Sequence, residues 1–229
     1  MFVNDMEYTK KKYGIFKRII NAFLPERCPY CNKVVALGEK ACDECLRDFP
    51  EIIYIRRAIG GYLTVSPLPF MDNFSKAIKR FKFKRKTQFA TQLATPIAEA
   101  VAKEYKDFEF DMISCVPLHP RKLNERGFNQ SEILAREVSE MLSVPFEHTL
   151  IKTKHNEPQH SLKGDKRKKN VKGVYKVKDK MLIKNKRILL IDDIITSGNT
   201  LGECAKMLDI GGAEIICCAT FATVVAKTT

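Results

Sequence analysis

The chain has 229 residues, of which 45% are hydrophobic and 29% are charged. This ordinary globular composition excludes a chain that is disordered along its whole length, and the length allows one large domain with a small module. The 40 Lys and Arg residues outnumber the 27 Asp and Glu residues, which gives a formal net charge of +13. That excess favours polyanionic partners such as nucleic acid, phosphorylated ligands or anionic lipid, and simple solubility is the alternative explanation.

Residues 1–24 form the first zone, a basic segment whose apolar residues recur at helical spacing. The pattern predicts an amphipathic helix packed on the body of the protein, with a helix lying on a membrane surface as the alternative. We see no apolar run long enough for a signal peptide or a membrane span. We therefore expect no stable membrane insertion and a cytoplasmic location.

Residues 25–50 form the second zone, which holds two CxxC pairs within 18 residues. Cys28 and Cys31 make the first pair, and Cys42 and Cys45 make the second. Two such pairs supply the four thiolates of a tetrahedral zinc site, which leaves no open position for catalysis. We predict one structural Zn²⁺ per chain, with redox or buried thiol pairs as the alternative. The other cysteines lie in apolar patterns and are read as buried thiols: Cys115, Cys204, Cys217 and Cys218.

Residues 51–229 form the third zone, in which strand and helix patterns alternate. Alternation of this kind predicts an α/β domain with a mainly parallel sheet and flanking helices. Asn129 and Ser131 are both candidate N-caps for the helix that starts near them. In chain order we expect a strand region at 51–63, helices at 74–84 and 87–105, a strand at 110–118, a loop at 119–128, a helix at 129–143, strands at 146–153, 174–177 and 186–193, a helix at 199–212 and a last strand at 214–222.

Two adjacent carboxylates, Asp192 and Asp193, follow the apolar run of residues 188–191. The carboxyl ends of parallel strands form the rim where open α/β folds bind ligands. A small polar turn, residues 196–200, then leads into a helix whose first N–H groups can hold a phosphate. Carboxylates beside a phosphate site suit a sugar with a vicinal diol and a 5′-phosphate. A surface turn capped by the acids is the alternative, but it does not require two consecutive acids.

The segment ILLIDDIITSGNT resembles the 5-phosphoribosyl-1-diphosphate (PRPP) motif of type I phosphoribosyltransferases. VPLHPRKLNERGFNQSEILA, residues 116–135, and EPQHSLKGDKRKKNVKGVY, residues 157–175, resemble signatures of the competence protein ComF family. The four-cysteine segment completes the arrangement of that family, and the resemblance covers nearly the whole chain from about Leu24. It implies a type I phosphoribosyltransferase-like domain over 51–229, preceded by a zinc ribbon over 25–50.

The resemblance also implies that the chain binds PRPP with Mg²⁺. Asp192 and Asp193 would be the catalytic residues, whose carboxylates hold the ribose and stabilise positive charge near its reacting carbon. The ribose and 5-phosphate would be bound by Asp192, Asp193, Thr196, Ser197, Gly198, Asn199 and Thr200. The pyrophosphate would be bound by His119, Arg121, Lys122 and Arg126, each of which has a solvated surface charge as its alternative role.

The polar loop 155–173 lies where the family has a flap over the active site. The flap residues would be Gln159, Ser161, Arg167 and Asn170, and a solvated loop is the alternative. Two basic runs are candidate contacts for single-stranded DNA, since cations neutralise phosphates. They are Lys79, Arg80, Lys82, Lys84, Arg85 and Lys86 in the first run and Lys166, Lys168 and Lys169 in the flap. We expect Phe81 and Phe83 between them to be buried rather than to stack on bases.

Family resemblance thus predicts a protein that binds Mg²⁺–PRPP and transfers phosphoribose to an unidentified acceptor. It implies a role in natural transformation, with single-stranded DNA and other competence proteins as partners. A non-catalytic adaptor for single-stranded DNA, with a sensing or vestigial PRPP pocket, is the rival hypothesis. A nucleobase salvage enzyme is the weaker one, because no base-binding segment is recognisable.

Overall fold

The computed structural model describes residues 25–83, 87–154 and 173–225. Several predictions therefore lie outside the described residues. They are the helical lead of residues 1–24, the basic residues Lys84, Arg85 and Lys86, and the flap with Gln159, Ser161, Lys166, Arg167, Lys168, Lys169 and Asn170. Among the described residues no helix is both long and apolar enough to cross a membrane.

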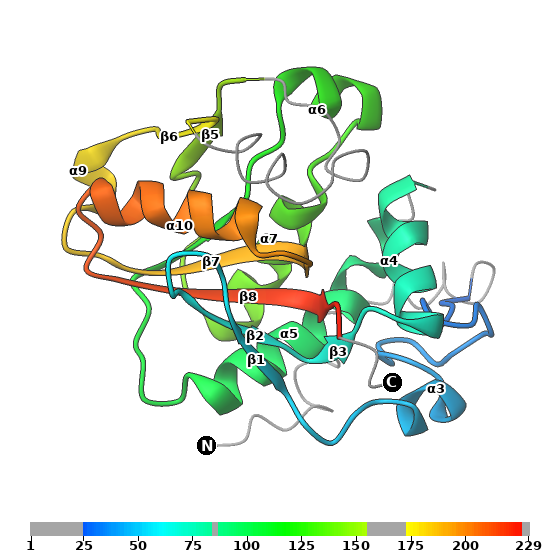
Figure 1. The fold of residues 1–229 in the computed structure, drawn as a ribbon. Coiled ribbons are helices and arrows are strands. Elements are labelled where there is room, and N and C mark those ends of the chain that lie inside the picture. Colours follow the sequence, from blue (N-terminus) through cyan, green and yellow to red (C-terminus); the bar gives the residue numbers. More distant parts are fainter. Residues whose placement is uncertain (1–24, 84–86, 155–172, 226–229) are drawn as a thin grey trace.

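The centre of the molecule is a mainly parallel sheet, as the alternating pattern predicts (Figure 1). Its strand order is β1-β2-β8-β7-β4, and only the β1–β2 pair is antiparallel. The short strand β3 also pairs with β8. The strands are β1 (Tyr54–Arg57), β2 (Leu63–Ser66), β3 (Leu68–Pro69), β4 (Met112–Cys115), β7 (Arg187–Ile195) and β8 (Ile215–Thr223).

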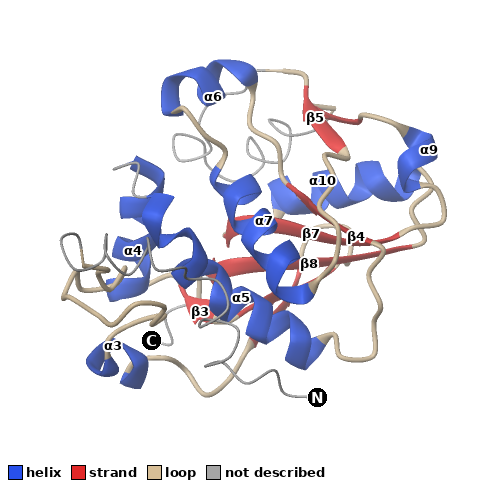
Figure 2. Ribbon diagram, turned by 180° about the vertical axis from the view of Figure 1, so that it is seen from behind, coloured by secondary structure: helices blue, strands red, loops and turns tan. Residues whose placement is uncertain are grey.

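The central strand β7 is buried on both faces because helices cover both sides of the sheet. Ile188 and Leu190 join a cluster with α10 (Asn199–Ile210), whereas Leu189 and Ile191 join a cluster with α5 (Ala90–Glu104) and α7 (Gln130–Leu142). This alternation follows from the two-residue period of a strand. Figures 1 and 2 show α10 on one side of the sheet and α5 with α7 on the other.

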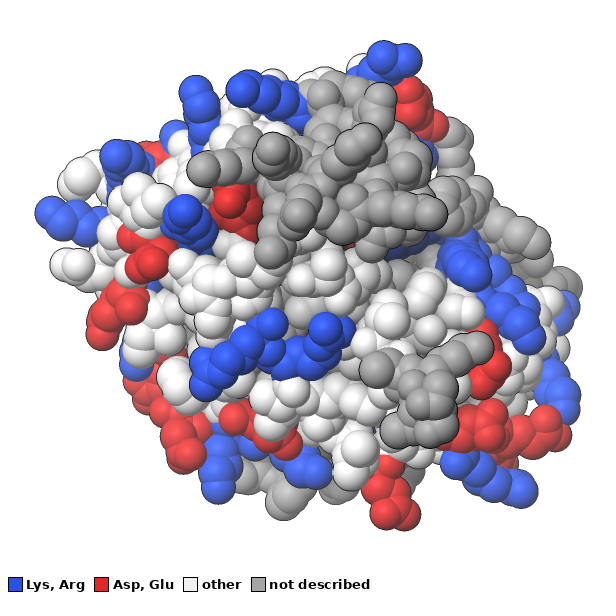
Figure 3. Space-filling view, in the orientation of Figure 1, with Lys and Arg blue, Asp and Glu red and all other residues white. Residues whose placement is uncertain are grey.

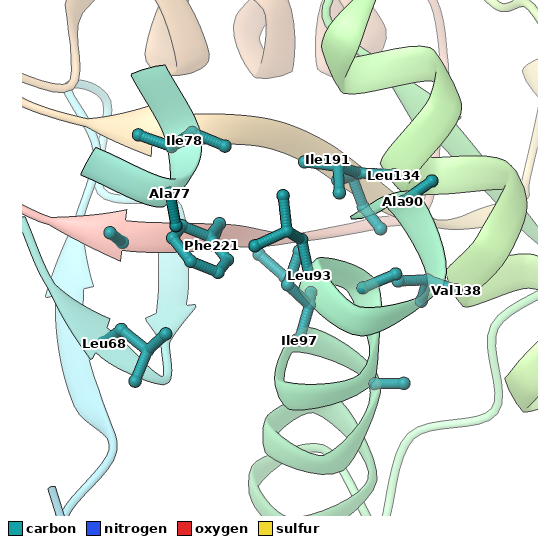
Figure 4. Close-up of a cluster of buried hydrophobic side chains, with 14 of the residues drawn as sticks. Leu68, Ala77, Ile78, Ala90, Leu93, Ile97, Leu134, Val138, Ile191 and Phe221 are labelled. Atoms are coloured by element: carbon teal, nitrogen blue, oxygen red, sulfur yellow. The ribbon is translucent and has the colours of Figure 1, made fainter. Parts of the chain in front are cut away.

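The larger apolar cluster joins the sheet to α4 (Asp72–Phe83) as well as to α5 and α7. In Figure 4, Phe221 of β8 lies between Ile78 of α4 and Leu93 of α5. The 3₁₀ turn η1 (Thr87–Phe89) leads into α5 and buries Phe89 in the same cluster. Phe81 of α4 is also fully buried, as predicted, so the apolar face of α4 packs against the core.

The cysteine segment, which includes α3 (Asp43–Arg47), packs into this same cluster. The Tyr30 ring lies edge-on to Phe49 and Phe74, and it stacks on Phe221 with ring centroids 6.4 Å apart. The Arg80 guanidinium donates to the backbone oxygens of Pro29 and Tyr30, each at 2.8 Å. The predicted ribbon and the α/β domain therefore share one continuous core.

The expected loop at 119–128 is instead the helix α6 (Pro120–Arg126). His119 caps it by accepting the N–H of Arg121, and Pro120 suits the first helical position. Gly127 ends it in the left-handed conformation, with φ 85°. Both ends of α6 therefore carry a sequence signal for a helix. The segment was predicted as a loop because its composition is polar and it lacks an apolar helical pattern.

The strand expected at 146–153 shortens to β5 (Leu150–Lys152) and does not enter the main sheet. It pairs with β6 (Tyr175–Val177) in a separate antiparallel pair, which is followed by the short helix α9 (Lys180–Ile183). An isolated bridge from Phe146 to Ile113 and a buried hydrogen bond between the Thr149 and Ser114 hydroxyls, at 2.7 Å, tie this segment to β4. This pair lies at the same end of the molecule as α6 (Figure 1).

Candidate functional site

The acidic pair lies within the last residues of β7, which runs on to Ile195. Both carboxylates are buried, with Asp192 8% and Asp193 5% exposed. A cavity of about 460 Å³ opens at this end of the sheet. Every residue from Asp192 to Thr200 lines it, so the structure brings together all the residues predicted for the ribose and the 5-phosphate.

Asp192 is held in a fixed orientation by two hydrogen bonds to its Oδ1 atom. The Ser131 hydroxyl donates to this oxygen at 2.7 Å, and the backbone N–H of Asp193 donates to it at 2.8 Å. Burial raises the pKa of Asp192 to about 6, against the lowering effects of the Ser131 hydrogen bond and the Lys82 and Lys152 charges. At neutral pH Asp192 is therefore mainly an ionised acceptor for ligand hydroxyl groups.

The polar turn begins α10 with Gly198 in the left-handed conformation, at φ 72°. A Cβ atom on Gly198 would lie 3.1 Å from the Ala58 Cα atom, so glycine also permits close packing on the β1–β2 hairpin. Arg56 of that hairpin donates to the Thr196 carbonyl at 3.2 Å and to the Val224 carbonyl at 3.0 Å. The β1–β2 hairpin thus supports the turn, and Thr196 and Ser197 are exposed at the start of a 12-residue helix.

Only one of the four predicted pyrophosphate residues, Lys122, lines the cavity. Arg121 is exposed and its Nε atom donates to Glu125 at 3.2 Å. The Arg126 guanidinium donates to Gln130, and its burial lowers its pKa. His119 caps α6, so folding of this segment into a helix directs its cations to different partners.

Two cations assigned to a nucleic-acid surface have internal partners, which corrects that assignment. Arg80 binds the carbonyls of the cysteine segment, as described above. The Lys82 ammonium forms an ion pair with the Asp193 carboxylate inside the cavity. Burial of Lys82 lowers its pKa to about 8, although the Asp192 charge opposes this. Lys79 remains exposed and lies over the Phe70 ring, 5.8 Å from its centroid.

Three further cavity residues were missed from the sequence: Ser131, Lys152 and Tyr175. Asn129 takes the N-cap of α7 by accepting the N–H of Ser131, which leaves the Ser131 hydroxyl for Asp192. Lys152 of β5 lies over the Tyr175 ring of β6, 5.3 Å from its centroid. The capping pattern at 129–131 was the available signal for Ser131. No sequence signal pointed to Lys152 or Tyr175, because only the pairing of β5 with β6 brings them together.

The four cysteines of the second zone form a compact cluster whose sulfur atoms all lie within 4.8 Å of one another. The Sγ atoms of Cys31 and Cys42 are 3.5 Å apart. Tetrahedral zinc with bonds of about 2.3 Å separates its sulfur ligands by about 3.8 Å, so the donor set fits such an ion. The cluster is a candidate metal centre, and it lies apart from the residues that line the cavity.

Surface charge is not gathered in a single field on the visible face. In Figure 3, Lys and Arg side chains form several separate groups, and Asp and Glu side chains lie between them. Although the net charge is +13, the described residues on this face form no continuous basic track.

Comparison with known proteins assigns the family. The phosphoribosyl transferase domain matches residues 125–229. Competence protein ComFC of Streptococcus pneumoniae is 32% identical over 190 residues, which cover 82% of this chain and 77% of that protein. Competence protein F of Haemophilus influenzae is 28% identical over 194 residues, which cover 82% of this chain and 81% of that protein.

A solved adenine phosphoribosyltransferase from Thermoanaerobacter pseudethanolicus matches 78% of this chain and 99% of its own, with 13% identity and a TM-score of 0.41. The family assignment rests on the curated relatives, and the fold class on the domain match and the mainly parallel sheet. This chain belongs to the competence protein ComF family and has a type I phosphoribosyltransferase fold.

Proposed function

We propose that the protein binds PRPP with Mg²⁺ and transfers its phosphoribosyl group to an acceptor. The observation that carries this proposal is one cavity lined both by the buried acidic pair and by the polar turn at the start of α10. In this assignment the 2,3-diol donates hydrogen bonds to Asp192 and Asp193. The 5-phosphate lies at the turn, where backbone N–H groups and the helix dipole favour an anion.

The proposed reaction breaks the bond between C1 of the ribose and the diphosphate oxygen, and it forms a bond from C1 to the acceptor. Positive charge then develops at C1 and the ring oxygen, as in other glycosyl transfers. Asp192 and Asp193 stabilise that charge electrostatically while they hold the diol. Bound Mg²⁺ supplies neutralisation of the departing pyrophosphate.

Calorimetric titration with Mg²⁺–PRPP tests the pocket. We expect micromolar binding by the wild type and a loss of at least about tenfold in the Asp192→Asn/Asp193→Asn variant, because charge-assisted hydrogen bonds contribute roughly 1.5–3 kcal/mol each. Asp107→Asn, at an exposed position outside the cavity, is the matched control and should bind as the wild type does. A wild type that does not bind PRPP would contradict the proposal.

The biological role that we propose is DNA handling in natural transformation, together with other competence proteins. The names of the relatives support this role: they include competence proteins and, in Escherichia coli, a DNA utilization protein. A non-catalytic single-stranded-DNA adaptor is the second candidate, favoured by the net charge of +13. Gel shifts with single-stranded DNA should show binding that weakens steeply as salt rises. Absence of a shift at low salt would count against DNA handling, both by a transferase and by a non-catalytic adaptor.

Release of pyrophosphate separates the catalytic proposals from the adaptor. A salvage enzyme would release pyrophosphate from PRPP when a free nucleobase is added, whereas the adaptor would release none with any acceptor.

We also propose a structural Zn²⁺ at Cys28, Cys31, Cys42 and Cys45, because their clustered thiols suit tetrahedral coordination. Metal analysis of protein purified without added metal should find one zinc per chain.

A further inference from the structure

Three lysines from three separate elements converge on the cavity. Lys82 comes from α4, Lys122 from α6 and Lys152 from β5. None of them is in the polar turn or the acidic strand, so none is used to bind the ribose or the 5-phosphate. The sequence predicted a pyrophosphate role for Lys122 but not for Lys82 or Lys152. Their convergence also depends on the tertiary fold, since α6 and β5 lie outside the main sheet.

The three ammonium groups give the cavity more positive than negative charge. Asp192 and Asp193 supply two carboxylates, and only Lys82 forms an ion pair with them among the described residues. Burial lowers the pKa of Lys152, and the charge of the nearby Lys122 lowers it further. Half-buried like charges repel each other unless an anion lies between them, so the cavity favours an anionic ligand group here.

The geometry of a 5-phosphoribosyl compound places its second anionic group at this point. Substituents on C1 and C5 leave the ribose ring on opposite sides, with the 2,3-diol on the edge between them. If the turn holds the 5-phosphate and the acids hold the diol, the C1 group extends past the acids, away from the turn. Lys82 lies beside Asp193 at that position.

We propose that Lys82, Lys122 and Lys152 bind the diphosphate on C1 of the substrate. Lys82 then exchanges its ion pair with Asp193 for a diphosphate oxygen, which leaves the Asp193 carboxylate for the ribose hydroxyls. Ammonium groups suit this task, because a compact point charge can bind phosphate oxygens from several directions. This assignment rests on the proposed PRPP function. It replaces Arg121, which is exposed and paired with Glu125, as a main pyrophosphate contact.

Calorimetry with three ligands tests the lysine site: Mg²⁺–PRPP, Mg²⁺–pyrophosphate and ribose 5-phosphate, which lacks the diphosphate. Lys152→Met is the main variant because it removes the charge and keeps the chain length. Lys176→Met is the matched control, since Lys176 is an exposed residue of β6 that faces Ile151 in the same strand pair. Lys82→Met is the second variant, with thermal unfolding as a check because it leaves Asp193 buried without its cation.

We expect Lys152→Met and Lys82→Met each to weaken PRPP and pyrophosphate binding by about tenfold or more, the effect of one charge-assisted contact. Ribose 5-phosphate should bind Lys152→Met within about twofold of the wild type, and Lys176→Met should match the wild type for all three ligands. Unchanged PRPP and pyrophosphate binding in both variants would overturn the lysine assignment while the PRPP function stood. An equal loss for all three ligands would also overturn it, since that result indicates general disruption.

A wild type that binds pyrophosphate through these lysines but does not bind PRPP would separate the two proposals. The lysine site would then stand as an anion site and the phosphoribosyl function would fail. Binding of neither ligand would reject both.

Discussion

Burial of Asp192 makes its contribution to the free energy of unfolding depend on pH. Its pKa rises from the ordinary 3.8 to about 6, so the folded protein holds a proton that the unfolded chain releases. This contribution stabilises the folded state fully below about pH 4 and is lost as pH rises through about 6. Ionised Asp192 therefore lowers the free energy of unfolding by about 2–3 kcal/mol at neutral pH, as 1.36 kcal/mol per pKa unit implies.

Substitution of Asp192 by Asn removes this dependence. We expect the stability of the variant, relative to the wild type, to increase by about 2–3 kcal/mol between pH 4 and pH 7.5. Urea unfolding at intervals across that range measures the difference, with Asp107→Asn as the exposed control. A difference between variant and wild type that stays constant with pH would show that Asp192 does not ionise in this range.

At the scale of elements, the β1–β2 hairpin fixes the start of α10. Gly202 of α10 packs directly on the hairpin backbone, where an added Cβ atom would lie 2.1 Å from the Ile59 carbonyl oxygen. Gly198 meets the Ala58 backbone one turn earlier, and Arg56 holds the Thr196 carbonyl. The polar turn of residues 196–200 is therefore positioned by an antiparallel hairpin at the edge of the sheet.

Gly202→Ala should separate the helix from the hairpin. We expect a net destabilisation of about 1–3 kcal/mol, because the backbone clash outweighs the gain in helix propensity of roughly 1 kcal/mol. PRPP binding should weaken as well, since the turn loses its support. Lys206→Ala, at an exposed position of the same helix, should change stability by less than about 0.5 kcal/mol. A Gly202→Ala protein as stable as the wild type would show that the hairpin yields without cost.

The same elements show which features of the fold and the site can be predicted from local sequence patterns. Runs such as residues 188–191 are apolar without interruption, so their burial in a parallel sheet followed from composition alone. The acids and turn of residues 192–200 are continuous in the chain, which is why their shared site could be predicted. Lys82, Lys152 and Ser131 reach the same cavity from distant segments, and no local pattern encodes that meeting. Lys82 was misassigned for this reason, since a basic run looks solvated unless a buried acid is known to lie opposite.

At the scale of the whole molecule, the cysteine segment and the α/β domain pack into one apolar cluster. Cys28, Cys45 and Tyr30 are buried in the cluster that also contains Phe74 and Phe221. Arg80 then ties α4 to the loop between Cys28 and Cys31 through two carbonyl contacts. Disorder in the cysteine segment would expose the side of the core on which it packs. Lys82 lies in α4 two residues after Arg80 and lines the cavity, so the disturbance would extend to the cavity.

Metal removal should therefore destabilise the whole chain rather than melt a separate module. We expect chelation, or the Cys28→Ser substitution, to remove the proposed zinc and lower the melting temperature of a single cooperative transition. Each kcal/mol lost should lower it by about 2–4 °C for a chain of this size. Calorimetric unfolding with parallel zinc analysis measures both quantities. Cys217→Ala is the control, because Cys217 is a buried cysteine outside the four-cysteine group and its loss should leave the zinc content unchanged. Two separate transitions, or an unchanged melting temperature after zinc loss, would show that the α/β domain is stable without the cysteine segment. Since that segment covers aromatic rings of the shared core, a single lowered transition is the outcome that its packing requires.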